Sequence, residues 1–492
     1  MDNKVSRRTF LGATASAAAA ITVIPSHVMG NILGHKAPSD KLNVAVVGPG
    51  GRANGILNSA SAMGENIVAL CDVDWNRAKS AFERYPNARK YWDYRKMYDE
   101  MRNIDAVVVG TADHTHCVIA AQAMTLGKHV YVEKPLTHSV YESRLLTKLA
   151  GKYKIATQMG NQGSSDEGVR QICDWMADGQ IGEVVSVESS TNRPIWPQGL
   201  ITPSQGQWVP DTLNWDLFIG PAKMIPYHEV YHPRMWRGWW AFGTGALGDM
   251  ACHIMHPIFK ALHLGYPTKV QGSSTMLCVD SAPVAQKIKL TFPARTHLNT
   301  KKVKYPEVEV TWTDGGIMQD YPKGWPKDGR WDDSGNVVFH GTKDTLICGC
   351  NAANPWLLSG RKPASPKTQR EVPSAPEGIK AETHTVDWLR ACKENPATRT
   401  ETASPFAEAG PFNEMVVMGV LAVRLQGLGK VLLWDGPNMQ FTNIDDNEEI
   451  RWVTSEVGMT RNRTEPINAK ATAQELIKHT YRQGWSLPDM PA

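Results

Sequence analysis

The sequence predicts an α/β protein in which an N-terminal parallel, doubly wound domain precedes an α+β domain with a large, mostly antiparallel sheet. The first domain is indicated by a glycine-rich turn directly after a short apolar strand, and by further short apolar runs separated by stretches of helical length. The second domain is indicated by a change after residue 162, where apolar and polar residues begin to alternate as they do in half-exposed strands.

The glycine-rich turn is the first candidate site. The apolar, β-branched run 42–47 ends in Gly48-Pro49-Gly50-Gly51-Arg52-Ala53. Gly48 permits a sharp turn, Gly50 lets the backbone approach a pyrophosphate, and the following helix offers free N–H groups to the anion. The alternative is a glycine-rich surface turn that binds no ligand.

An acidic residue follows this turn at the distance expected for a Rossmann dinucleotide-binding domain. The second apolar run, 67–71, leads into Asp72, which lies 22 positions after Gly50. An acid at this spacing accepts hydrogen bonds from ribose hydroxyls and repels a 2′-phosphate, which favours NAD. Arg77 lies close in sequence and keeps NADP as the open alternative.

The first 30 residues are expected to be a signal peptide of the twin-arginine type. Ser6-Arg7-Arg8-Thr9-Phe10-Leu11-Gly12 precedes the small, apolar stretch 13–24. The pattern predicts export of a folded protein to the periplasm, where free NAD is scarce, so the cofactor should be tightly held. A short N-terminal helix with two basic residues is the alternative.

Composition limits the partners. A chain of 492 residues with a formal net charge of +4 gives no reason to expect nucleic acid or a membrane surface as a partner. The eight cysteines form no C-x-x-C pair, and Asp249, His253 and His256 lack a clear third-ligand pattern, so no metal is expected.

Polar residues follow three later strands of the predicted parallel sheet. The strands 104–109, 129–132 and 155–159 are followed by Thr111-Ala112-Asp113-His114, Glu133-Lys134-Pro135 and Gly160-Asn161-Gln162. Ligands of such sheets gather outside the carboxyl ends of the strands. The three segments are therefore expected to share one crevice.

The order and spacing of these motifs over residues 41–162 resemble the Gfo/Idh/MocA family, the relatives of glucose-fructose oxidoreductase and inositol dehydrogenase. The resemblance implies that Lys134 projects toward the nicotinamide and the substrate hydroxyl, that Pro135 follows a cis bond, and that His114 lines the cofactor site. The glycine-rich turn, the polar residues at the strand ends and the resemblance together predict the cofactor-binding residues. These are Gly48, Gly50, Gly51, Arg52, Asp72, Thr111, His114, Glu133, Lys134, Asn161 and Gln162.

The second domain is expected over residues 163–467, before a C-terminal tail, 468–492, that has no assigned role. Strands are predicted at 182–189, 270–276, 286–292, 308–313, 337–340 and 345–348, and helices at 169–177, 382–392 and 414–428. The resemblance implies a homo-oligomer that forms through the open face of this sheet.

An aromatic-rich segment, 196–240, lies near the start of the second domain and contains six tryptophans. Aromatic faces with hydrogen-bonding groups between them suit a sugar, so Arg193, Trp236 and Arg237 are candidate substrate-binding residues. The alternative is a segment that packs on its own core.

The chemistry is expected on a helix that follows this segment. Asp249 and His253 are four residues apart, so they face the same side of a helix. The resemblance implies a catalytic group of Lys134, Asp249 and His253. An imidazole suits removal of a hydroxyl proton, and the lysine can stabilise a developing alkoxide. His256 stands where relatives often carry an acid, and it is a further candidate substrate contact.

The sequence therefore predicts an exported NAD(P)-dependent oxidoreductase that transfers hydride between nicotinamide and a hydroxyl carbon of a sugar, sugar alcohol or glycoside. One alternative is a redox-neutral glycoside hydrolase or lyase that acts through a transient keto-sugar. The other is a nucleotide-binding protein without catalysis, which the intact set Lys134, Asp249 and His253 argues against.

Overall fold

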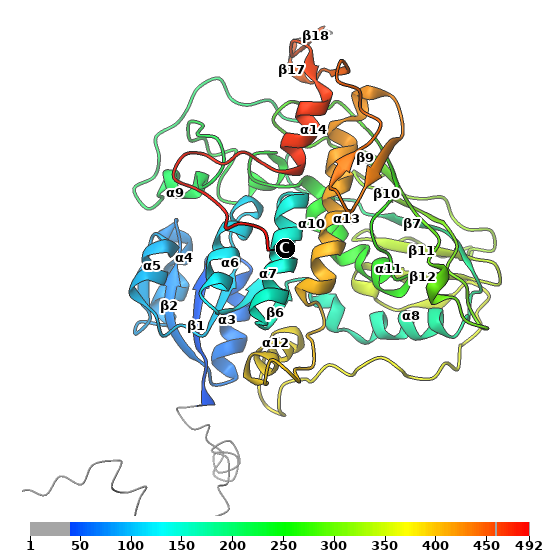
Figure 1. Ribbon diagram of the computed structural model, residues 1–492, viewed down its shortest axis with the longest axis horizontal. Helices are drawn as coiled ribbons and strands as arrows, with labels where there is room; N and C mark the ends of the chain where they lie inside the picture. Colours follow the sequence, from blue (N-terminus) through cyan, green and yellow to red (C-terminus); the bar gives the residue numbers. More distant parts are fainter. Residues whose placement is uncertain (1–39, 458–459, 492) are drawn as a thin grey trace, which may run out of the picture. The chain divides into compact units, whose positions relative to one another are not determined.

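The computed structural model describes residues 40–457 and 460–491. The described residues from 42 onward form one compact unit by their contacts. The expected signal peptide falls outside the described residues. Figure 1 shows the first sheet and its helices in blue and cyan, and most of the second sheet in green to yellow, with its last strands in orange.

The first sheet is a parallel Rossmann sheet, as predicted. In the described part of the chain it has six strands in the order β3-β2-β1-β4-β5-β6. They are β1 (Asn43–Val47), β2 (Asn66–Cys71), β3 (Arg89–Tyr91), β4 (Ala106–Val109), β5 (His129–Val132) and β6 (Thr157–Met159). The sequence analysis missed β3, because its residues are mostly charged and exposed.

Five helices connect these strands, and three of them begin at a capping side chain. They are α3 (Ala53–Ala62), α4 (Trp75–Arg84), α5 (Tyr94–Glu100), α6 (His116–Thr125) and α7 (Val140–Tyr153). Asp74 caps α4 by accepting from the N–H groups of Asn76 and Arg77, and Asp93 caps α5. A capping box of Ser139 and Glu142 starts α7.

The second sheet is mostly antiparallel, as predicted. Its nine strands among the described residues follow the order β13-β12-β11-β7-β10-β9-β8-β14-β15, and the one parallel pair is β7 with β10. They are β7 (Val184–Ser190), β8 (Lys269–Ser274), β9 (Gln286–Phe292), β10 (Val308–Thr313), β11 (Asn336–Gly341), β12 (Thr345–Gly349), β13 (Trp356–Leu357), β14 (Leu432–Asp435) and β15 (Gln440–Phe441).

Seven further helices and two small two-stranded sheets complete the described part of the fold. The helices are α8 (Glu167–Ala177), α9 (Trp215–Ile219), α10 (Gly245–Ile254), α11 (His256–Ala261), α12 (Thr383–Lys393), α13 (Phe406–Arg424) and α14 (Ala469–Ile477). The strands β16 (Glu449–Ile450) and β19 (Ile467–Asn468) form one pair, and β17 (Val453–Val457) and β18 (Thr460–Arg463) form the other.

Helix α13 is the central packing element. It contacts α7 on one side and the strands β8 and β9 on the other, so one apolar core runs from the first sheet to the second (Figure 1). By length and composition α13 could also cross a membrane, but 78% of its apolar window is buried inside the protein. Its apolar surface is therefore that of a core helix.

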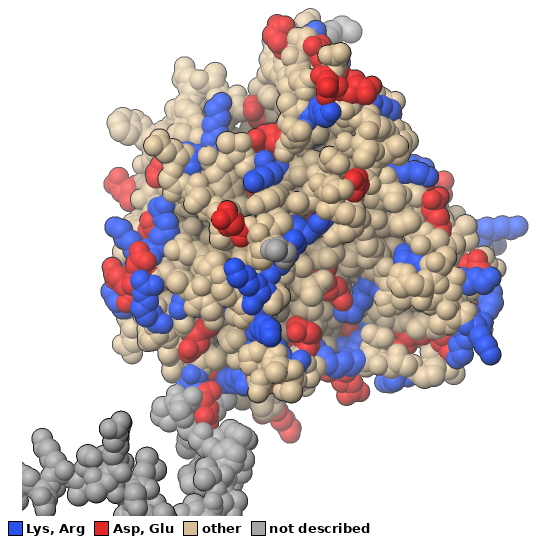
Figure 2. All heavy atoms as spheres, in the orientation of Figure 1, with Lys and Arg blue, Asp and Glu red and all other residues tan. Residues whose placement is uncertain are grey.

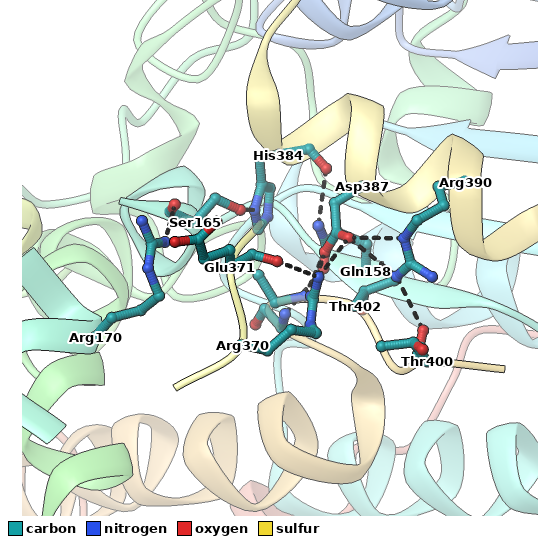
Figure 3. Close-up of polar contacts among 12 residues, drawn as sticks. Gln158, Ser165, Arg170, Arg370, Glu371, His384, Asp387, Arg390, Thr400 and Thr402 are labelled. Carbon is teal, nitrogen blue, oxygen red and sulfur yellow. Dashed lines mark hydrogen bonds and ion pairs between the residues drawn. The ribbon is translucent and has the colours of Figure 1, made fainter. Parts of the chain in front are cut away.

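Helix α12 covers the opposite face of the Rossmann sheet, where Trp388 joins the apolar cluster of β1 and β4. Asp387 fixes this helix in a buried polar network (Figure 3). Its carboxylate accepts from Arg370 at 2.8 Å, from Arg390 at 3.0 Å and from the Ala403 N–H at 2.8 Å. Three partners on separate segments thus converge on one carboxylate.

Positive and negative side chains are interspersed over the face shown in Figure 2. Ion pairs among the described residues join strands or turns, as in Lys289 with Glu309 at 2.8 Å and Lys430 with Glu448 at 2.6 Å. The surface charges of this face therefore form no large field of one sign.

Candidate active site and nucleotide pocket

The glycine turn adopts a conformation that only glycine accommodates. Gly48 has φ +84°, and a Cβ atom on it would lie 2.7 Å from the carbonyl oxygen of Gly110. A Cβ on Gly110 would in turn lie 2.5 Å from the Cβ of Ala53. The turn therefore packs closely on the end of β4, and helix α3 begins directly behind it.

Asp72 is joined to this turn. Its carboxylate accepts hydrogen bonds from the N–H of Gly50 at 3.1 Å and from the N–H of Asp74 at 2.9 Å. Arg77 donates to the carbonyl oxygen of Gly50 at 3.0 Å. Burial raises the pKa of Asp72 to about 6, so the carboxylate titrates near neutral pH.

A pocket opens beside the turn and runs across the strand ends. Its lining includes the predicted residues Gly48, Asp72, Thr111 and His114. Aromatic and apolar side chains complete it, namely Val47, Val73, Trp92, Tyr94, Ala112, Leu217, Phe218 and Trp485. The imidazole of His114 lies 2.9 Å from the Phe218 carbonyl oxygen, and burial lowers its pKa to about 3.

Glu133 holds the predicted residues Arg52 and Gln162 together next to β5. Gln162 donates to Glu133 at 3.1 Å, and the guanidinium of Arg52 lies 3.8 Å away. Arg52 also pairs through two hydrogen bonds of 2.8 Å with Glu382, just before α12. Burial raises the pKa of Glu133 to about 7, against the lowering effect of Arg52.

Lys134, Asp249 and Arg237 form a compact charged cluster. The Lys134 ammonium donates to a carboxylate oxygen of Asp249 at 2.8 Å and to its carbonyl oxygen at 2.7 Å. Arg237 donates to the same carboxylate oxygen at 3.0 Å. Burial alone would raise the pKa of Asp249, but Lys134 and Arg237 outweigh it and hold that pKa below its usual value. The Lys134–Pro135 peptide bond is cis, as the resemblance implied.

His253 lies one turn after Asp249 on α10. Burial and the charge of Lys134 lower the pKa of its imidazole to about 3, so the ring is neutral at physiological pH. Its Nδ1 atom has no hydrogen-bond partner among the described residues. The same holds for both amide atoms of Asn161 and for the amide oxygen of Asn351.

The side chains of His253, Asn161 and Asn351 line one small cavity. Buried polar atoms in native proteins are nearly always hydrogen-bonded to protein, water or ligand. Asn161 is 1% exposed and has neither amide atom satisfied by the described protein. The cavity has no room for a water molecule in this structure, so these polar atoms are buried next to His253 without a ligand-sized space beside them.

His256 lines the same cavity as His253, but its ring nitrogens are both engaged by protein groups. Its side chain is 2% exposed, with one ring nitrogen 3.0 Å from Ser164 and the other 2.8 Å from Glu408. His256 therefore ties α11 to α13. Neither ring nitrogen is free for a substrate in this structure, which corrects the expectation that His256 is a substrate contact.

The aromatic-rich segment divides into two parts. Trp215, Tyr231 and Trp239 are buried in their own apolar cluster, as the packing interpretation expects. Trp236 belongs to that cluster, but the guanidinium of Arg237 lies 4.4 Å from its ring centre, which helps to aim Arg237 at Asp249. The aromatic segment thus holds Arg237 in place on Asp249 through the contact with Trp236.

Arg193, a predicted substrate contact, donates to the side chain of Asn192. Its charge and that of Lys134 act on the thiol of Cys350, whose pKa is raised to about 11, chiefly by burial. The described structure thus joins Arg237, but not Arg193 or His256, to Asp249 by a hydrogen bond.

The sequence analysis missed Asn351, Glu382 and Trp485. Each reaches the site from a segment that carries no recognisable motif, and Asn351 has a left-handed backbone with φ +59°. In the described residues, no group of three or more His, Cys, Asp or Glu side chains is placed to hold a metal ion.

The described geometry fits a nicotinamide dinucleotide. A glycine-rich turn lies at a helix start, an acid borders the pocket at the ribose position, and Lys134 follows the strand two places further along the sheet. The fold and site thus define a nucleotide-binding oxidoreductase.

Residues 42–161 match the family profile described as an oxidoreductase family with an NAD-binding Rossmann fold, and residues 183–315 match its C-terminal α/β domain. The chain belongs to the Gfo/Idh/MocA family of oxidoreductases.

Curated relatives match part of the chain. Inositol 2-dehydrogenase of Salmonella typhimurium is 27% identical over 126 residues, which are 25% of this chain and 37% of that protein. Glycosyl hydrolase family 109 protein 2 of Shewanella sp. strain ANA-3 is 26% identical over 277 residues, 54% of this chain and 56% of that protein. The chain thus spans about a third to about half of the length of these relatives.

Solved structures share the fold over most of the chain. The WlbA dehydrogenase from Bordetella pertussis, in complex with NADH and UDP-GlcNAcA, is 16% identical with a TM-score of 0.53 over 80% of this chain and 99% of that one. Levoglucosan dehydrogenase, in complex with NADH and L-sorbose, is 16% identical with a TM-score of 0.50 over 78% and 97%.

We expect the affinity for NAD to fall as the pH drops through about 6, because protonation of Asp72 removes a charged acceptor for the ribose hydroxyls. The variant Asp72→Asn should bind NAD about tenfold more weakly at pH 8 and show little pH dependence. Titration calorimetry between pH 5 and pH 8 measures both effects. Asp211→Asn, at an exposed position, is the control. A constant affinity of the unmodified protein over this range would contradict the prediction.

Proposed function

We propose that the protein is an NAD-dependent dehydrogenase that acts on a hydroxyl carbon of a sugar, sugar alcohol or glycoside. The observation that carries this proposal is the cluster of Lys134 and Asp249 beside the neutral imidazole of His253. Bound NAD would supply the hydride acceptor. The names of the relatives and neighbours, inositol 2-dehydrogenase and levoglucosan dehydrogenase among them, support a carbohydrate-like substrate.

The residues of the chain then have separate tasks in the oxidation. A C–H bond breaks with loss of hydride, the hydroxyl proton leaves, and a C=O bond forms. Lys134 is a cation that stabilises the oxygen as the proton departs. His253 enters unprotonated and can accept that proton, or Lys134 can pass it on. Asp249 and Arg237 fix the position of the lysine ammonium.

A second function is favoured by one observation, the match to a family 109 glycosyl hydrolase over 277 residues. In this redox-neutral alternative, oxidation to a ketone acidifies the neighbouring C–H bond and the glycoside is eliminated. In the hydrolase, water would add to the resulting unsaturated ketone in place of the leaving group, and bound NADH would return the hydride to the ketone. Net NADH is not formed.

One experiment distinguishes the two. The purified protein is incubated with NAD and a panel of sugars, sugar alcohols and aryl glycosides, while NADH absorbance and leaving-group release are followed together. Sustained NADH formation with a keto product supports the dehydrogenase. Leaving-group release without net NADH supports the redox-neutral reaction, and absence of NAD binding contradicts both.

Three further expectations extend the proposal. Export by the twin-arginine route rests on Arg7 and Arg8 before an uncharged stretch. Tight retention of the cofactor rests on that export. NADP as the alternative nucleotide rests on Arg77, which lies beside the glycine turn. Assembly through the open face of the second sheet rests on the half-exposed side chains of β9 and β10.

A further inference from the structure

The C-terminal segment returns from the second domain to the Rossmann domain. After α14 it passes α9 and α6 and ends beside α7 (Figure 1). The main-chain N–H of Arg482 donates to the Pro221 carbonyl oxygen at 2.9 Å, and its side chain donates to Gly220 at 3.0 Å. Lys148 on α7 donates to the Pro491 carbonyl oxygen at 3.1 Å. The segment is therefore fixed at several points.

A further contact fixes the segment at the start of α7. The hydroxyl of Tyr481 donates to Glu142, the buried acid of the capping box. Glu142 is 2% exposed and accepts in addition from the N–H groups of His138 and Ser139. This contact joins the tail to an element that directly follows the Glu133-Lys134-Pro135 strand end.

Trp485 lies between these anchors and forms part of the wall of the nucleotide pocket. The guanidinium of Arg95 lies 4.4 Å from its ring centre, and the ring of Tyr94 lies 6.3 Å away. Gly48 and Asp72 line the same pocket. Because these residues mark the ribose and pyrophosphate of the adenosine half, Trp485 faces that half of a bound dinucleotide.

We propose that Trp485 is a cofactor-binding residue that covers the adenosine half of NAD, and that the anchored tail makes release of the nucleotide slow. The inference rests on the proposed function, since it takes NAD as the ligand of this pocket. An aromatic side chain offers a flat apolar surface on which adenine can stack, as bases do on the aromatic side chains of proteins that bind single-stranded nucleic acids. Release then requires either the nucleotide or the tail to move.

The test compares Trp485→Ala with the unmodified full-length protein. We expect NADH to dissociate about tenfold faster from the variant, measured by displacement with excess NAD and loss of nicotinamide fluorescence. The affinity for ADP-ribose should fall by a similar factor, because that probe contains only the adenosine half and the second ribose. Trp208→Ala is the matched control, since Trp208 is 97% exposed and lies outside the pocket lining.

A second variant keeps the inference testable if Trp485→Ala does not fold. Arg482→Gln leaves the pocket wall unchanged and loosens the tail, so NADH release should again be faster. Unchanged release rates in both folded variants would overturn the inference while leaving the proposed function intact. Failure of the unmodified protein to bind NAD or ADP-ribose would instead overturn the proposed function itself.

Discussion

Replacing Lys134 by methionine is expected to lower kcat by about a thousandfold and to leave the Kd for NAD nearly unchanged. The side chain of Lys134 is 13% exposed, and its ammonium is held on Asp249. It is therefore a fixed positive charge beside the cavity of His253 and Asn161, and not a mobile surface lysine. Removing it takes away the group that stabilises negative charge on the substrate oxygen, whereas the glycine turn and Asp72 stay in place.

The measurement is a steady-state rate with the best substrate of the panel, together with a fluorescence titration of NAD. Lys79→Met is the control, because Lys79 is 70% exposed and lies on the outer side of α4. The double variant Lys134→Met/Asp249→Asn removes both partners of the ion pair. It therefore distinguishes loss of the lysine as a reacting group from loss of turnover caused by an unpaired Asp249 carboxylate. A double variant that recovered turnover would contradict the role given to Lys134, as would a single variant that lost NAD binding equally.

Local sequence patterns were sufficient to predict the Rossmann half. Strand β1 and its turn are specified by the mostly apolar run 42–47 followed by glycines, and close backbone contacts in the structure explain Gly48 and Gly50. Strand β3 was missed because it lies at the sheet edge and has only Tyr91 buried. Edge strands need no apolar run, so periodicity does not indicate them.

The second half was harder to predict at its helix boundaries. Helix α13 begins at Phe406, eight residues before its predicted start at 414, and it contains Pro411. Proline inside a helix removes a backbone hydrogen bond and clashes with the preceding turn, so Pro411 disfavours the helix locally. The apolar contacts of Phe406 and Phe412 in the shared core outweigh this local cost.

The candidate site was predictable only where its residues follow strand ends or share one helix. Lys134 follows β5, and Asp249 and His253 lie on α10, so their grouping follows from topology. Contacts between distant segments were not predictable. The engagement of His256 by Glu408, 152 positions away, is decided by how α11 packs on α13.

Replacing Asp387 by alanine is expected to lower the free energy of unfolding by about 3 kcal/mol, because two guanidinium groups lose their shared acceptor. Asp387 is fully buried, while Arg370 and Arg390 are 33% and 23% exposed. Because water can partly solvate the two arginines, the expected loss of unfolding free energy lies at the lower end of the range for broken buried ion pairs. Figure 3 shows both arginines directed at this carboxylate.

The effect should extend to the nucleotide site. Helix α12 follows directly after Glu382, whose carboxylate binds Arg52 and whose N–H donates to Ser59 on α3 at 3.0 Å. A loosened α12 therefore releases Arg52 beside the turn, and we expect weaker NAD binding together with lower stability. Urea unfolding and NAD titration of Asp387→Ala measure the two effects, with exposed Asp211→Ala as control. Loss of stability with unchanged NAD affinity would show that α12 supports the sheet without positioning Arg52.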